Sequence, residues 1–130
     1  MDRLQTATHY LQSALRFMAG LLFLQHGMSK FFSFPHTQYS GTPLMSLDGA
    51  AGAIELVCGL LITLGLLTRP AAFLASGTMA FAYFIAHAPQ SFFPIVNGGD
   101  EAILYCFVFL YLAAAGGGPL SLDRLLRKGS

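Results

Sequence analysis

The stretch that decides the fold is residues 49–88, GAAGAIELVCGLLITLGLLTRPAAFLASGTMAFAYFIAHA. It holds two apolar runs, at 49–67 and 71–88, and each approaches the ~20 residues that a helix needs to cross the hydrocarbon core of a membrane. The connection between them begins at Thr68 and ends at Pro70. So short a connection predicts an antiparallel pair of helices, with Thr68 as the N-cap and Pro70 in the first turn of the second helix.

The composition of the whole chain agrees with a membrane location. Of its 130 residues, 55% are apolar and only 10% are charged, and the mean hydropathy is +0.60. An average soluble domain has about a quarter of its residues charged, and its surface needs them to stay solvated. The high hydrophobicity also excludes disorder, and a net charge of +1 gives no basic surface for nucleic acid. The length predicts one domain, residues 1–130, and the composition predicts an integral membrane protein.

Two further apolar stretches, near 11–33 and 101–117, complete a set of four predicted spans. They lack the two-residue alternation of membrane barrel strands, and in lipid the backbone must satisfy its own hydrogen bonds. The sequence therefore predicts an all-α fold, an antiparallel bundle of four transmembrane helices. Residues 121–128 follow the break at 116–119 and predict a short amphipathic helix at the membrane interface.

The distribution of basic residues predicts the orientation of the bundle. If the N-terminus is inside, six of the seven Lys and Arg residues fall on the inner side, namely Arg3, Arg16, Arg69, Arg124, Arg127 and Lys128. The positive-inside rule then places both termini in the cytoplasm. A cleaved signal peptide is the alternative interpretation of the start of the chain, but the apolar run at 17–24 is not followed by a small-x-small cleavage site.

Ionisable side chains within the predicted spans are the candidate functional residues, because each costs several kcal/mol unless it faces the bundle interior, a partner or water. Gln12, Arg16, His26 and Lys30 fall within about an 80° arc of the first span at 3.6 residues per turn. His26 and Glu55 lie on the order of 10 Å below the outer boundary at ~1.5 Å per residue. We expect Glu55 to pair with Lys30 or His26.

This pattern predicts one polar cluster in the outer half of the bundle. The candidate catalytic residues are His26, Lys30 and Glu55, and the candidate ligand-binding residues are His26, Lys30, Glu55, Tyr83, His87, Glu101 and Tyr105. Structural interpretations compete: Lys30 snorkels to the interface, Glu101 belongs to a helix start, and His87 is an interface residue. No spacing of His and carboxylates predicts a metal site.

Two other pairs of residues have structural interpretations. Arg16 lies near the inner boundary, where we expect a structural ion pair with Asp123, although anchoring at the lipid headgroups is an alternative. Cys58 and Cys106 lie within spans but are poorly aimed at one another on the helical period, so we expect small apolar fillers; a redox pair is the alternative.

The motifs also resemble a known family. They are Arg16-(x)9-His26-Gly27-(x)2-Lys30, Gly52-(x)2-Glu55-(x)3-Gly59, Gly65-Leu66-Leu67-Thr68-Arg69-Pro70 and Gly118-Pro119-Leu120-Ser121-Leu122-Asp123. Together they resemble the DoxX family over nearly the whole chain. The resemblance implies a four-helix protein of the bacterial inner membrane. It also implies an oxidoreductase or a subunit of one, linked to quinone or to thiol and sulfur chemistry, because the family is named for a subunit of an archaeal thiosulfate:quinone oxidoreductase. The chain has no haem, flavin or iron–sulfur motif, so redox chemistry requires an external cofactor or partner.

Three functions compete at this point. The first is a redox-associated membrane component that binds a quinone, in which His26 and Glu55 hydrogen-bond or protonate the ring oxygens, Lys30 stabilises negative charge, and Tyr83 and Tyr105 line the site. The second is a small proton-coupled transporter, which four helices support only as a homo-oligomer. The third is a non-enzymatic subunit whose C-terminal basic helix anchors a soluble redox partner, although anionic lipid explains that helix equally well.

Overall fold

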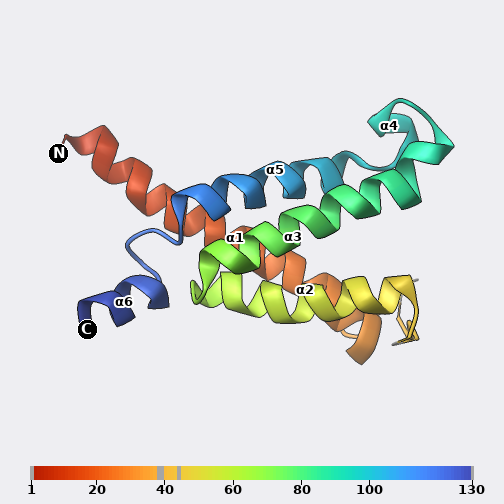
Figure 1. The fold of residues 1–130 in the computed structure, drawn as a ribbon, viewed down its shortest axis with the longest axis horizontal. Helices are drawn as coiled ribbons and strands as arrows, with labels where there is room; N and C mark the ends of the chain where they lie inside the picture. The colour runs from red at the N-terminus through yellow and green to blue at the C-terminus, as the bar shows by residue number, and fades with distance from the viewer. Residues whose placement is uncertain (1, 38–39, 44, 130) are drawn as a thin grey trace.

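The computed structural model describes residues 2–37, 40–43 and 45–129, and the side chains of residues 128 and 129 lie outside that description. Within these ranges the fold is all-helical, as predicted, and contains no strand. Figure 1 shows the long helices lying side by side, with both ends of the chain at one end of the molecule and α4 (Pro94–Asn97) at the other. We call the first the terminal end and the second the α4 end.

Helix α1 (Arg3–Phe32) is the longest element and begins well before the predicted start at residue 11. The reason is local: Asp2 is its N-cap, and the carboxylate accepts a hydrogen bond of 2.8 Å from the backbone N–H of Gln5. The helix ends at Ser33, which adopts a left-handed conformation. Its buried face recurs every three or four residues, as the sequence predicts, and includes Arg16, Gly20, Phe23 and Gly27.

Helix α2 (Leu47–Leu64) starts at Ser46, whose hydroxyl accepts from the N–H of Gly49, and stops at Gly65, which takes a positive φ of 72°. The amides of Gly65 and Leu66 close the C-terminus by bonding back to the carbonyls of Ile62 and Leu61. This stop falls before the predicted end at residue 67.

Helix α3 (Thr68–Ala82) begins directly after a left-handed residue, Leu67, with a φ of 50°. The prediction that Thr68 is the N-cap is wrong, because Leu67 occupies that position and has no capping side chain of its own. Asp123, distant in sequence, caps the helix instead: its two carboxylate oxygens accept from the N–H groups of Leu67 at 2.8 Å and Thr68 at 2.9 Å. Pro70 lies in the first turn, as predicted.

The second half of the chain completes the fold. Helix α3 continues into a π-helical turn, η1 (Tyr83–His87), and a 3₁₀ turn, η2 (Ala88–Gln90). After α4, helix α5 (Asp100–Ala115) runs to the glycine-rich break that the sequence predicts. Helix α6 (Leu122–Gly129) follows as the predicted short amphipathic helix, with Leu125 and Leu126 exposed.

Helices α1 and α2 form one tightly packed pair, α3 and α5 form another, and contacts between α2 and α3 join the two pairs (Figure 1). Glycines set the α1–α2 distance: a Cβ at Gly20 would lie 2.6 Å from the backbone nitrogen of Thr63, and one at Gly27 would lie 2.8 Å from the carbonyl oxygen of Gly52. Helices α1 and α5 touch only lightly.

Two helical segments of the described chain are long and apolar enough to cross a membrane, Leu47–Leu64 and Thr68–Gln90. Helix α5 has only 16 residues, about 24 Å at ~1.5 Å per residue. Many large apolar side chains nevertheless point outward, including Phe73, Phe84, Leu104 and Phe107. An apolar exterior of this kind is typical of helices whose solvent is lipid.

Candidate functional site

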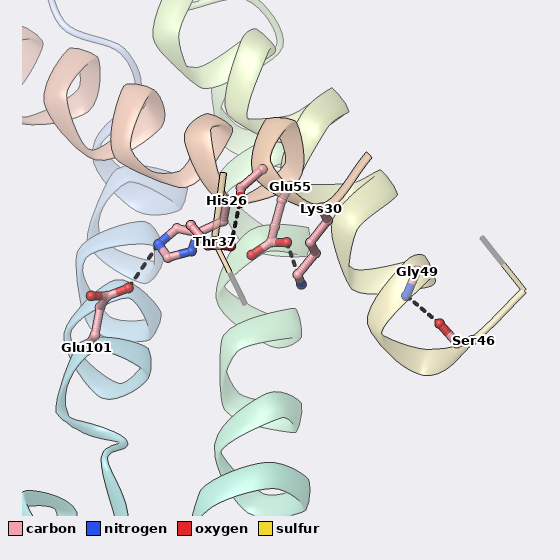
Figure 2. A network of polar contacts seen from close by, with 8 residues as sticks. His26, Lys30, Thr37, Ser46, Gly49, Glu55 and Glu101 are labelled. Carbon is pink, nitrogen blue, oxygen red and sulfur yellow. Dashed lines mark hydrogen bonds and ion pairs between the residues drawn. The ribbon is translucent and has the colours of Figure 1, made fainter. Parts of the chain in front are cut away.

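Two buried charges on α1 and α2 form an ion pair. The ammonium Nζ of Lys30 lies 2.8 Å from Oε1 of Glu55, and the side chains are only 12% and 6% exposed. Gly52, one turn before Glu55, makes room for this pair, because the stem of Lys30 and the ring of Phe31 pass directly over it. Of the two partners predicted for Glu55, Lys30 and His26, the structure shows the ion pair with Lys30 (Figure 2).

A second ion pair links α1 to α5. The ring nitrogen Nε2 of His26 lies 2.9 Å from Oε1 of Glu101, and this pair is more accessible, with side chains 36% and 66% exposed. Figure 2 shows His26 reaching toward Glu101, with the Lys30–Glu55 pair close by, and the charge of Glu55 also interacts with His26.

Aromatic rings form the wall beside these charges. Tyr105 on α5 meets the His26 ring edge-on at 6.1 Å and stacks on Phe109 at 5.5 Å with an interplanar angle of 6°. Phe23 of α1 packs against both, at 5.7 Å from Tyr105 and 4.9 Å from Phe109. We define the outer cluster as the five residues that these contacts bring together: His26, Lys30, Glu55, Glu101 and Tyr105.

The two remaining predicted site residues belong to another group. Nδ1 of His87 lies 2.9 Å from the carbonyl oxygen of Asn97, and the side-chain amide of Asn97 donates to the hydroxyl of Tyr83 at 3.1 Å. Among the contacts of the described residues, none links Tyr83 or His87 to the outer cluster. The π-helical turn directs both side chains toward the connection that precedes α5. The turn changes the helical period locally, and no pattern in the sequence predicts this change.

Asn97 is a residue that the sequence analysis missed. It is only 3% exposed, and besides holding Tyr83 its side-chain oxygen accepts from the N–H of Gly99 at 2.8 Å. Its amide also donates to the carbonyl of Ser91 at 2.9 Å. An Asn before two glycines is an ordinary turn signal, so its sequence context indicates a loop and not a buried junction.

Among the described contacts, Arg16 and Asp123 form no direct ion pair, although the charge of Asp123 does act on Arg16 as the prediction expects. Arg16 is 3% exposed, and its Nη1 donates to the carbonyl oxygens of Gly117 at 3.1 Å and Leu120 at 3.0 Å. Asp123 uses its carboxylate on the first amides of α3. The correction has a physical reason: each charge finds unpaired backbone groups at a helix end or in a loop, and these are nearer than the opposite charge.

These contacts join three segments into one structural unit, which we call the terminal junction: Ser13 and Arg16 on α1, residues 65–68 between α2 and α3, and residues 117–123 after α5. Ser13 accepts from the N–H of Leu120 and donates to the carbonyl oxygen of Gly117. Asp123 also donates its own N–H to the carbonyl of Gly65 at 2.8 Å. The turn after α2, the loop after α5 and the first half of α1 therefore depend on one another.

Acidification is expected to loosen the terminal junction. Burial alone would raise the pKa of Asp123, but the N–H donors of Thr68 and Leu67, together with the charge of Arg127, lower the pKa below its usual value. Because the folded pKa is lowered, the stabilisation is complete above the ordinary carboxyl pKa and is lost as the pH falls through the lowered one. Hydrogen exchange at the amides of Leu67 and Thr68, measured from pH 7 to pH 3, should show this loss.

The variant Asp123→Asn supplies the control for that experiment. It keeps one side-chain oxygen as an acceptor, so at neutral pH it should leave one of the two amides without a partner, at a cost below about 1 kcal/mol. Hydrogen exchange at these amides in the variant should then change with pH only as the exchange rate of any unprotected amide does. If Asp123→Asn shows the same additional acid loosening as the native chain, the capping role of this carboxylate is wrong.

Comparison with known proteins places these features in a family. The DoxX family model matches residues 11–88, which include every member of the outer cluster that α1 and α2 supply. An uncharacterized protein of Haemophilus influenzae is 40% identical over 131 residues, covering 95% of this chain and 96% of that protein. A second uncharacterized protein of the same organism is 32% identical over 74 residues, covering 57% of this chain and 49% of that protein. No solved structure matches the chain. The family match and the similarity to a full-length relative show that this chain belongs to the DoxX family of membrane proteins.

Proposed function

We propose that this protein is a redox-associated component of the bacterial inner membrane, that it crosses the membrane four times with both termini in the cytoplasm, and that the outer cluster binds a quinone. The helical order supports the topology, because α1, α2, α3 and α5 alternate in direction and both termini lie at one end (Figure 1). The orientation is supported by the basic residues at this end of the molecule, namely Arg3, Arg16, Arg69, Arg124 and Arg127.

The observation that carries the proposal is the buried Lys30–Glu55 pair beside the accessible His26–Glu101 pair. A buried ion pair is a poor device for stability alone, since removing both charges from water costs about as much as their attraction returns. Ionisable groups retained inside a membrane protein are therefore usually functional. Here one pair, His26 and Glu101, is accessible to solvent, and the other, Lys30 and Glu55, is almost completely buried.

The residues of the cluster fit a quinone. Lys30 and His26 offer N–H donors to a ring oxygen, and the half-buried ring of Tyr105, backed by the buried ring of Phe109, offers a surface for a ring. Entry from the lipid is favoured between α1 and α5, because these helices touch only lightly and are linked mainly by side chains. A bound quinone supplies two-electron chemistry that the chain itself lacks.

The chain's own residues then have distinct roles. His26, hydrogen-bonded to Glu101, holds or releases a proton at Nε2 where solvent reaches it. Lys30 presents positive charge to a ring oxygen, and Glu55 fixes the position of that charge. Figure 2 shows the two pairs side by side.

Quinone binding to the purified protein in lipid nanodiscs tests this proposal. We expect a short-chain ubiquinone analogue to bind the native chain, and Glu55→Gln and His26→Gln to weaken that binding by about tenfold or more, equivalent to about 1.4 kcal/mol. The matched control is Asp48→Asn, which removes an exposed carboxylate in the first turn of α2. Equal affinity in the native protein, Glu55→Gln and His26→Gln would remove the proposal.

A further inference from the structure

A groove of about 870 Å³ opens at the terminal end, far from the outer cluster. Its walls come from the first turns of α1, the start of α3, the loop after α5 and the α6 helix. A volume of this size falls within the range of specific small-molecule sites. The groove is lined by residues that the proposed quinone site does not use, so its occupant is an independent question.

The charged side chains that line this groove are mainly positive. Three arginines line it, Arg69 at the start of α3 and Arg124 and Arg127 on α6. Asp123 is the acidic residue among the lining side chains, and both of its oxygens are held by the amides of Leu67 and Thr68. The groove therefore presents net positive charge, and its preferred ligand carries negative charge.

The position of Arg69 is set by a missing side chain. Gly116 adopts a φ of 87°, and a Cβ there would lie 3.2 Å from Nε and 3.5 Å from Nη2 of Arg69. The edge of the guanidinium that carries Nε and Nη2 therefore lies close to the backbone where α5 ends. A planar guanidinium binds phosphate through paired N–H donors better than an ammonium does.

The surroundings of the groove favour a lipid over a soluble anion. Tyr10 and Leu126 supply apolar lining beside the arginines. Leu125 and Leu126 are exposed on α6, the amphipathic helix that forms one wall. Basic pockets at the membrane-facing ends of helices bind the headgroups of anionic lipids, while apolar side chains nearby accept the start of the acyl chains.

We propose that this groove binds the phosphate headgroup of an anionic membrane phospholipid, held by Arg69 and Arg124 and closed on one side by α6. The inference rests on membership in a membrane protein family and on the groove itself, and it holds whether or not the outer cluster binds quinone. It also assigns α6 a specific task, since this helix supplies one of the arginines that contact the phosphate.

Delipidated protein provides the test. Its thermal unfolding is measured in neutral detergent with dioleoylphosphatidylglycerol, dioleoylphosphatidylcholine or inorganic phosphate added at equal concentration. We expect the phosphatidylglycerol to raise the Tm of the native chain and the other two additions to leave it unchanged. The double variant Arg69→Gln/Arg124→Gln should lose most of that rise and should retain several-fold less phosphatidylglycerol in native mass spectrometry.

Arg3→Gln is the matched control, because it removes a positive charge at the same end of the molecule from an exposed residue that does not line the groove. It should keep the full response. An equal loss in Arg3→Gln would show that general surface charge attracts the lipid and would overturn the proposal. Equal stabilisation by inorganic phosphate would overturn the lipid as occupant, and equal stabilisation by phosphatidylcholine would overturn the role of charge.

Discussion

Gly59→Ala is expected to separate α1 from α2 and to cause a large fall in the thermal stability of the protein. A Cβ at this position would lie 2.7 Å from the Cα and 2.8 Å from the backbone nitrogen of Leu24. Backbone atoms cannot rotate out of the way, so the whole helix must move. Overpacking of this kind costs about 1–3 kcal/mol or more, and membrane helices rely on such close approach for their association.

The chain contains a matched control for this substitution. Gly77 lies in the interior of α3, and a Cβ there would meet nothing within 4 Å. Gly77→Ala should therefore leave the Tm unchanged or raise it slightly, since alanine favours a helix over glycine. Unfolding in detergent, followed by circular dichroism, compares the two variants. Equal stability of Gly59→Ala and Gly77→Ala would contradict the packing of α1 on α2.

Gly52→Ala should fall between these two variants. Its added Cβ would meet ring and stem atoms of Phe31 and Lys30 at 3.0–3.1 Å, and side chains of this kind can shift. The order of stability among the three alanine variants thus reports which contacts involve backbone and which involve side chains.

Lys30→Met is expected to be the most damaging single change in the outer cluster. It leaves the carboxylate of Glu55, whose side chain is 6% exposed, without a counter-charge. Removing one partner of a buried ion pair costs about 3–5 kcal/mol, because the remaining charge is desolvated and unpaired. The second substitution Glu55→Gln in the same chain should recover most of that loss, since it removes the unpaired charge.

The exposed pair supplies the comparison. Glu101→Gln removes the contact with His26, but its side chain is 66% exposed, so the expected loss is below about 1 kcal/mol. The measurement is the thermal stability of four variants: Lys30→Met, Glu55→Gln, the double variant of these two, and Glu101→Gln. A double variant as unstable as Lys30→Met alone would show that Lys30 stabilises the fold by packing and not by pairing with Glu55.

Much of the fold follows from the sequence because helix faces repeat. The period of 3.6 residues predicts that Arg16, Gly20, Phe23 and Gly27 share a buried face, and they do. The same argument places Glu55 inward on α2, where it pairs with Lys30, one of the two partners predicted for it. These predictions concern residues on one helix or on two helices that follow each other in the chain, so the helical period of 3.6 residues is sufficient to make them.

The errors arise where partners are distant in sequence or where the helical period changes. The contacts of Asp123 with Leu67 and Thr68 join segments that no periodicity relates, so the sequence predicts its partner of opposite charge, Arg16, and not these two amides. Tyr83 and His87 were grouped with the outer cluster on an α-helical period, but the chain forms a π turn there. Tyr105 follows the regular period of α5, and its predicted place beside His26 is found.

The cap that Asp123 provides has a consequence for biosynthesis. The first turn of α3 cannot be completed by its own segment, because the carboxylate that satisfies its amides is made only after α5 has been synthesised. During synthesis this turn therefore stays open until residue 123 has been made. A chain cut before Asp123 would keep every long helix and would still lack the acceptor that closes the first turn of α3.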